Sequence, residues 1–140
     1  AVILHGYSRA TGDLDIMISL DSLNVRKFIN LIKRLHWKPR VPVALDAFAD
    51  AEIRKMWIKD KGMKVFSVYN PDKPIEHIDV MVEDYIDYQK AYRRRKVISV
   101  GRMKVPVASI DDLIRLKRIA GRERDKIDIR ALTEIRKLQK

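Results

Sequence analysis

Three carboxylates on two short apolar segments have the type and spacing of a divalent-metal site. Asp13 and Asp15 stand two positions apart in DLDIMIS, and Asp79 stands in EHIDVMV. Alternate residues of a β-strand leave the same face, so Asp13 and Asp15 would project side by side. Two ionised carboxylates that close repel each other unless a cation lies between them, and Mg²⁺ prefers such oxygen ligands.

An Asp-x-Asp pair is weak evidence on its own, because the chain contains fourteen aspartates and such pairs arise by chance. On that evidence alone, two solvated carboxylates at a sheet edge are the favoured interpretation of Asp13 and Asp15. Asp79 strengthens the metal interpretation because a second strand can present it at the same spot. Three carboxylates suit a pair of Mg²⁺ or Mn²⁺ ions about 4 Å apart, as in phosphoryl or nucleotidyl transfer. His77 shares the predicted face of Asp79, but a surface or packing role is the favoured interpretation.

The elements that must position these side chains alternate between strands and helices. Period-two patterns predict strands over 13–19, 64–69 and 76–82, and a hairpin over 98–107 that turns at Gly101-Arg102. Helical spacing predicts helices over 24–35, capped by Asn24, and over 50–59, 84–94, 109–120 and 124–138. The predicted class is therefore α/β or α+β, a single domain over 1–140 with a small mixed sheet flanked by helices and a C-terminal helical pair.

Two segments resemble a known family. HGYSRATGDLDIMI (5–18) resembles the motif of minimal nucleotidyltransferases of the DNA polymerase β superfamily, especially the group with the abortive-infection and type IV toxin–antitoxin nucleotidyltransferases. VPVASIDDLIRLKRIAGRERDKIDIRAL (105–132) is similar to that group's C-terminal signature of a Lys, then an Arg, then Asp-x-x-Asp. The resemblance implies a nucleotidyltransferase fold in which Asp13 and Asp15 hold two metals and Asp79 completes the site.

The resemblance also implies an activity. The protein would transfer a nucleoside monophosphate from a nucleoside triphosphate to an acceptor hydroxyl and release pyrophosphate, with Mg²⁺ or Mn²⁺ as cofactor. The catalytic residues would be Asp13, Asp15 and Asp79, with Asp79 holding the catalytic metal and helping to deprotonate the acceptor. The acceptor stays open among RNA, protein and small molecules.

One departure from the family pattern opens an alternative. The superfamily has a Gly-Gly or Gly-Ser pair at the start of the helix before the Asp-x-Asp strand, where the helix N-terminus holds the triphosphate. That pair would lie before Ala1, and the chain begins with AVIL and no Met, so we expect the first helix to extend upstream. Otherwise the protein is a catalytically silent member of the fold that acts as a binding or toxin–antitoxin partner.

Three further residues are candidates for binding the nucleotide. Arg9 and Thr11 lie within the family motif, where they would contact phosphate or shape the loop; solvation and a Thr–backbone hydrogen bond are the equally weighted alternative. Lys117 falls in the middle of an apolar helical stripe. It would either reach nucleotide phosphates or form a buried ion pair with Asp128 or Asp125 of the last helix.

The overall charge suits a polyanionic partner. The net charge is +11 and the pI is about 10.0, which a well-solvated basic surface would also explain. The run 93–96 is a candidate RNA-backbone contact, so a basic RNA-binding module is a further alternative. The chain has no cysteine and no apolar run long enough to span a bilayer, so the expected location is the cytoplasm, without a membrane partner.

Overall fold

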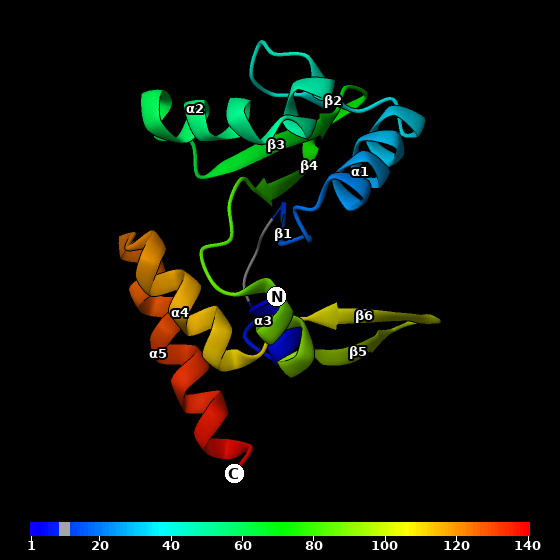
Figure 1. The fold of residues 1–140 in the computed structure, drawn as a ribbon. Coiled ribbons are helices and arrows are strands. Elements are labelled where there is room, and N and C mark those ends of the chain that lie inside the picture. The colour runs from blue at the N-terminus through cyan, green and yellow to red at the C-terminus, as the bar shows by residue number, and fades with distance from the viewer. Residues whose placement is uncertain (9–11) are drawn as a thin grey trace. The chain divides into compact units, whose positions relative to one another are not determined.

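The computed structural model describes residues 1–8 and 12–140, and the chain divides into two compact units (Figure 1). The sheet unit comprises Thr11–Asp84, and the C-terminal unit comprises Ala1–Ala10 with Tyr85–Lys140. Both α-helices and strands are present, so the mixed α/β class predicted from the sequence is confirmed. The single domain over 1–140 stays a prediction.

The sheet unit carries one mixed four-stranded sheet with the strand order β1-β4-β3-β2. β1 pairs parallel with β4, whereas β2–β3 and β3–β4 are antiparallel. The elements of this unit are β1 (Asp13–Ile16), α1 (Ser22–Arg34), β2 (Lys38–Pro39), the 3-10 helix η2 (Leu45–Ala49), α2 (Ala51–Lys61), β3 (Val65–Asn70) and β4 (Lys73–Met81).

The core of the sheet unit lies on one face of this sheet. α1, η2 and α2 contribute Phe28, Phe48 and Trp57 to a cluster that packs against Phe66 of β3. The rings of Phe48 and Trp57 stack on Phe66 with centroid distances of 5.0 and 5.5 Å. Fully burying each such ring contributes about 1.5–3 kcal/mol, so the helices are held firmly to this face. The opposite face of the sheet is left for polar side chains.

Three local predictions need correction. The helix predicted over 84–94 begins only at Tyr88, because Asp87 is its N-cap and accepts the backbone N–H of Lys90. Asp21, not Asn24, caps α1: Asp21 Oδ1 accepts the backbone N–H of Asn24 at 2.9 Å, while Asn24 Nδ2 donates to Ser19 O. An N-cap accepts from the residue three positions on, and Asn24 is that residue. β1 also ends at Ile16 rather than at Ser19, because the chain leaves the sheet to reach the cap.

The C-terminal unit combines a two-stranded hairpin with helices. Its elements are the 3-10 helix η1 (Ile3–His5), α3 (Tyr88–Arg94), β5 (Lys96–Val100), β6 (Met103–Val107), α4 (Ile110–Ala120) and α5 (Glu123–Leu138). The hairpin turns at Gly101-Arg102 as predicted, and Gly101 takes a φ of 60°. Ser109 caps α4 by accepting the Asp112 N–H at 3.2 Å.

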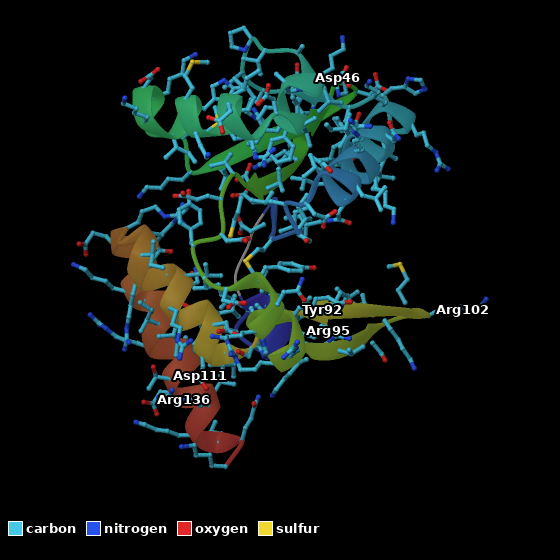
Figure 2. All side chains as sticks on the ribbon, in the orientation of Figure 1. Asp46, Tyr92, Arg95, Arg102, Asp111 and Arg136 are labelled. Atoms are coloured by element: carbon cyan, nitrogen blue, oxygen red, sulfur yellow. The ribbon has the colours of Figure 1, made fainter. Side chains whose placement is uncertain are left out.

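α4 and α5 form the predicted C-terminal helical pair (Figure 1). A small apolar cluster that includes Ile114 and Leu132 joins them. At their surface Arg136 pairs with Asp111 at 2.6 Å (Figure 2). Among the residues that the structure describes, no helix has both the length and the apolar character needed to cross a bilayer.

A buried ionic cluster links the same two helices. Lys117 Nζ lies 2.5 Å from Asp128 Oδ2 and 3.3 Å from Asp125 Oδ1, and the Lys117 side chain is 13% exposed. The sequence prediction that this amine approaches an aspartate of the last helix is therefore confirmed. Arg122 also donates to Asp125 from Nε at 2.8 Å and from its backbone N–H at 3.0 Å. Two cations thus face two carboxylates, so the cluster is electrically balanced.

The balance is visible in the pKa of Asp125. Burial by itself raises this pKa, but the hydrogen bonds from Arg122 and the ion pair with Lys117 outweigh burial and lower the pKa from 3.8 to about 2. A carboxylate whose pKa is lower in the folded than in the unfolded state stabilises the fold at pH values above the pKa of the unfolded state. That stabilisation is lost as the pH falls from about 4 toward 2.

We predict that Asp125→Asn weakens the dependence of stability on pH. A shift of nearly two pKa units corresponds to about 2 kcal/mol, which is the share of Asp125 in the rise of the wild-type free energy of unfolding between pH 2 and pH 4. That share should be missing in Asp125→Asn, whereas the lowered pKa values of Asp112 and Asp87 keep part of the rise. Urea unfolding followed by circular dichroism at several pH values measures both proteins.

Glu123→Gln is the matched control, because Glu123 lies in the first turn of the same helix and its side chain is 87% exposed. An exposed ion pair contributes little, so this variant should follow the wild-type pH profile within about 0.5 kcal/mol. An Asp125→Asn profile identical to wild type would contradict the assigned role of the buried cluster.

Candidate functional site

The parallel pairing of β1 with β4 brings the predicted carboxylates together. Asp15 lies opposite Asp79. Two residues earlier in both strands, Asp13 lies opposite His77. Residues opposite each other in a parallel ladder leave the same face, as do alternate residues of one strand. The four side chains therefore form a two-by-two array on one sheet face, and the predicted adjacency of the two strands is confirmed.

This array lies on the sheet face opposite the aromatic core. Phe66 and Val80, which stand next to Ser67 and Asp79 in their strands, are fully buried in that core. The alternation along β4 then directs His77 and Asp79 to the other face, where Asp15 is exposed. Tight packing on one face thus fixes which side chains the other face presents.

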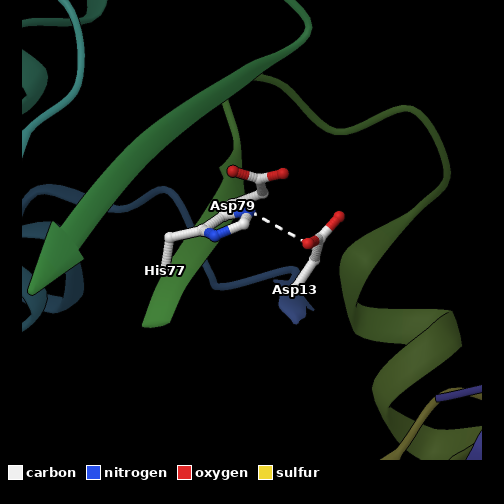
Figure 3. Close-up of side chains that lie close together, drawn as sticks. All are labelled: Asp13, His77 and Asp79. Carbon is white, nitrogen blue, oxygen red and sulfur yellow. Dashed lines mark ion pairs between the residues drawn. The ribbon is translucent and has the colours of Figure 1, made fainter. Parts of the chain in front are cut away.

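Three ligand atoms converge within the array (Figure 3). One atom each from Asp13, His77 and Asp79 lies within 4.8 Å of the other two. His77 Nε2 lies 3.1 Å from Asp13 Oδ1, and these side chains are 20% and 36% exposed. The imidazole Nδ1–H donates to the backbone carbonyl of Ile75 at 3.1 Å. A carbonyl oxygen can only accept, so Nδ1 carries a proton and Nε2 is the nitrogen that faces the carboxylate.

Asp79 is oriented from the strand on its other side. Ser67 of β3 lies opposite Asp79 in the antiparallel ladder, and the Ser67 hydroxyl donates a short hydrogen bond to Asp79 Oδ1. A carboxylate held by a hydrogen bond at one oxygen has a fixed plane, so its second oxygen points in a defined direction. Such an outer hydrogen bond is typical support for a metal ligand.

Gly12 allows the chain to approach this site closely. A Cβ atom at Gly12 would lie 3.3 Å from the carbonyl oxygen of Ile75 and 3.4 Å from its Cγ1. The same carbonyl oxygen accepts the hydrogen bond from His77. A glycine immediately before Asp13 therefore lets β1 enter the sheet without pushing on the group that orients the imidazole.

The sequence-predicted site residues fall into three groups. Asp13, Asp15 and Asp79 share one sheet face, although Asp15 is not one of the three residues whose ligand atoms converge. Lys117 belongs to the C-terminal unit, where its ammonium group contacts Asp125 and Asp128. Arg9 and Thr11 lie outside the described residues, so their nucleotide-binding roles stay predictions, as does that of Lys117.

Two residues of the site were not assigned to it from sequence. His77 was interpreted as surface or packing, although it stands two positions before Asp79 and therefore shares its face. Ser67 could have been found only from the register of the β3–β4 hairpin, which places it opposite Asp79. The predicted strands over 64–69 and 76–82 hid this register, because β3 in fact continues to Asn70 and β4 begins at Lys73.

Comparison with known proteins adds no relative. No protein-family model matches the sequence, and a search of curated proteins finds no match.

We predict that Gly12→Ala destabilises the sheet unit by about 1 kcal/mol, because Gly12 is exposed and the Ile75 carbonyl has to shift by only a few tenths of an ångström. The added methyl group would press on the Ile75 backbone, which cannot rotate away as a flexible side chain can. Urea unfolding monitored by the fluorescence of Trp37 and Trp57, both in the sheet unit, measures the change.

Asp72→Ala at the exposed β3–β4 turn is the control, and we expect it to change stability by less than about 0.5 kcal/mol. A Gly12→Ala protein as stable as wild type would show that β1 does not approach Ile75 as closely as described.

Proposed function

We propose that this protein is a divalent-metal-dependent nucleotidyltransferase that transfers a nucleoside monophosphate from a nucleoside triphosphate to an acceptor hydroxyl. The observation that carries the proposal is the register of β1 against β4, which sets Asp13 and Asp15 beside Asp79 on one sheet face. The motif around Asp13 and Asp15 supports the same chemistry through its resemblance to minimal nucleotidyltransferases of the DNA polymerase β superfamily.

The proposed reaction divides its work among the carboxylates. Asp13 and Asp15 would hold Mg²⁺ or Mn²⁺, and bound metal would neutralise the phosphate charge that develops during transfer. Asp79, with one oxygen held by Ser67, would accept the acceptor hydroxyl proton at its other oxygen. The acceptor oxygen bonds to the α-phosphorus as the bond from that phosphorus to the β-phosphate oxygen breaks, and pyrophosphate leaves.

Lys117, Arg9 and Thr11 are proposed nucleotide contacts with unequal support. A phosphate group would offer Lys117 the same charge that Asp125 and Asp128 now offer it. The two roles of this ammonium group therefore compete. Arg9 and Thr11 rest on the family motif alone.

We predict that nucleoside triphosphate binding needs Mg²⁺ or Mn²⁺ and depends on Asp15. Isothermal titration should show binding with either ion and none in EDTA. Asp15→Asn replaces an anionic ligand with a neutral one, so metal affinity should fall at least about 10-fold, since even residues one step removed from a metal change affinity by 10–100-fold. Equal triphosphate affinity in EDTA would contradict the proposal.

Asp60→Asn serves as the control for Asp15→Asn, because Asp60 belongs to the same unit but lies in the exposed last turn of α2.

Lys117→Met is titrated with the nucleoside triphosphate in the same series. A phosphate contact predicts a loss of about 1.5–3 kcal/mol in triphosphate binding, the contribution of a charged hydrogen bond. Unchanged affinity for the triphosphate would restrict Lys117 to the ion pairs with Asp125 and Asp128.

The transfer reaction itself is measured as pyrophosphate release when RNA, protein or small-molecule acceptors are added.

A second candidate function, RNA binding, is favoured by the distribution of charge. The C-terminal unit has 18 Lys and Arg against 7 Asp and Glu, whereas the sheet unit has 12 of each. The whole formal charge of +11 therefore lies in the C-terminal unit. Moreover, each of its seven acids already has an ion-pair partner within that unit. Its excess cations would attract a polyanion such as RNA.

The end of α3 and the hairpin offer both charge and a stacking group. The guanidinium carbon of Arg95 lies 3.9 Å from the centroid of the Tyr92 ring, and Tyr92 is 44% exposed (Figure 2). Arg93, Arg102 and Lys104 are exposed and, among the described residues, have no acid within ion-pair distance. An exposed aromatic ring and unpaired cations in the same unit suit single-stranded RNA, whose bases stack and whose phosphates pair with the cations.

We predict that a single-stranded RNA oligonucleotide binds with strong salt dependence in a fluorescence anisotropy assay. Tyr92→Leu should cost about 1–3 kcal/mol if one base stacks there. Replacing Arg102 and Lys104 with glutamine should reduce the salt slope by roughly one for each phosphate that these side chains neutralise. Lys126→Gln, which removes a cation already paired with Glu123, is the control. Binding unaffected by salt and by these variants would refute this second function.

A further inference from the structure

We infer that His77 is a direct metal ligand, and that its nitrogen makes this site favour a first-row transition-metal ion such as Mn²⁺ over Mg²⁺. The inference rests on the proposed metal-dependent function and names the class of ion that the site selects. It starts from the position of His77. This residue lies opposite Asp13, two residues along the strands from the Asp15–Asp79 pair.

The orientation of the ring makes Nε2 the available ligand atom. Ile75 O accepts from Nδ1 at 3.1 Å, so the proton of the neutral imidazole stays on Nδ1. Histidine ligands of metal ions usually donate their other ring N–H to a carbonyl or carboxylate, which fixes the ring and raises the basicity of the ligating nitrogen. The Ile75 carbonyl has this supporting role, and Gly12 leaves the space in which it can do so.

The contact between His77 and Asp13 has the spacing of two ligands of one ion. His77 Nε2 and Asp13 Oδ1 face each other at 3.1 Å, and a metal ion can lie between a nitrogen and an oxygen at this separation. Two ligands on neighbouring corners of an octahedron with bonds of about 2.1–2.2 Å are about 3.0–3.1 Å apart. The observed spacing therefore matches two adjacent ligands of one six-coordinate ion.

The mixture of ligand types determines which ion is favoured. Mg²⁺ is a hard cation that takes oxygen ligands and keeps several waters, so an imidazole adds little to its binding. First-row transition metals accept both carboxylate oxygen and imidazole nitrogen, and their affinity for such mixed sites rises from Mn²⁺ onward. A site with Asp13, Asp79 and His77 around one point thus gains selectivity for these ions from His77 (Figure 3).

Mn²⁺ alone is the probe that tests this inference, because its electron paramagnetic resonance reports both binding and the ligand atoms. Pulsed measurements on the wild-type protein with Mn²⁺ should show coupling to an imidazole nitrogen. The coupling should vanish in His77→Asn. Competition with Mg²⁺ gives the ratio of the two affinities, and we expect His77→Asn to lower the preference for Mn²⁺ about 10-fold or more. A merely structural role for His77 would lower both affinities together and leave the ratio unchanged.

His36→Asn is the matched control. His36 is exposed at the end of α1 with a φ of 56°, a conformation that asparagine tolerates well, so this variant should keep both the coupling and the ratio. Mn²⁺ binding without nitrogen coupling, or with an unchanged ratio in His77→Asn, would overturn the inference and leave the proposed function standing; the Asp13–His77 contact is then held by a proton. Absence of any Mn²⁺ or Mg²⁺ binding to the wild type would overturn both.

Discussion

The parallel ladder between β1 and β4 is the constraint on which the candidate site depends. It joins two segments far apart in the sequence and sets Asp13 opposite His77 and Asp15 opposite Asp79. A shift of one residue in this register would turn the carboxylates of β1 toward the aromatic core and bring Leu14 to the polar face. The core opposes such a shift because Ile16 of β1 packs against it. Hydrophobic packing on one face therefore fixes the chemistry of the other.

Support for the polar face also comes from β3 and from the backbone of β4 itself. The Ser67 hydroxyl of β3 holds one oxygen of Asp79, and the Ile75 carbonyl of β4 holds one nitrogen of His77. Asp79 and His77 are thus each oriented by a hydrogen bond made through an atom that they do not need for binding a cation. A site oriented in this way requires little rearrangement when an ion enters, which favours binding because fewer side-chain rotations have to be frozen.

The sequence predicted much of this arrangement because its signals are local. Alternating apolar residues marked β1 and β4, and the spacing of Asp13 and Asp15 placed them on one face. What the sequence left open depends on pairing between strands. Ser67 joins the site only through the hairpin register, and His77 becomes a candidate ligand only once Asp13 is known to lie opposite it. The predicted cap of α1 was wrong for a smaller reason, since Asp21 and Asn24 are both good N-cap residues and the helix began at the earlier one.

Charge separates the two units as clearly as topology does. The sheet unit has 12 Lys and Arg against 12 Asp and Glu, so it carries no net formal charge. The C-terminal unit holds the whole excess of +11, with its own acids already engaged in ion pairs such as that of Lys117 with Asp128. A polynucleotide and a metal-bound triphosphate are both anionic, yet they need different surroundings. A polynucleotide binds to exposed unpaired cations and an exposed aromatic ring. A metal-bound triphosphate needs converging oxygen and nitrogen ligands for its metal ion. Each unit supplies one of these, which is why the two proposed functions concern different residues and can be tested independently.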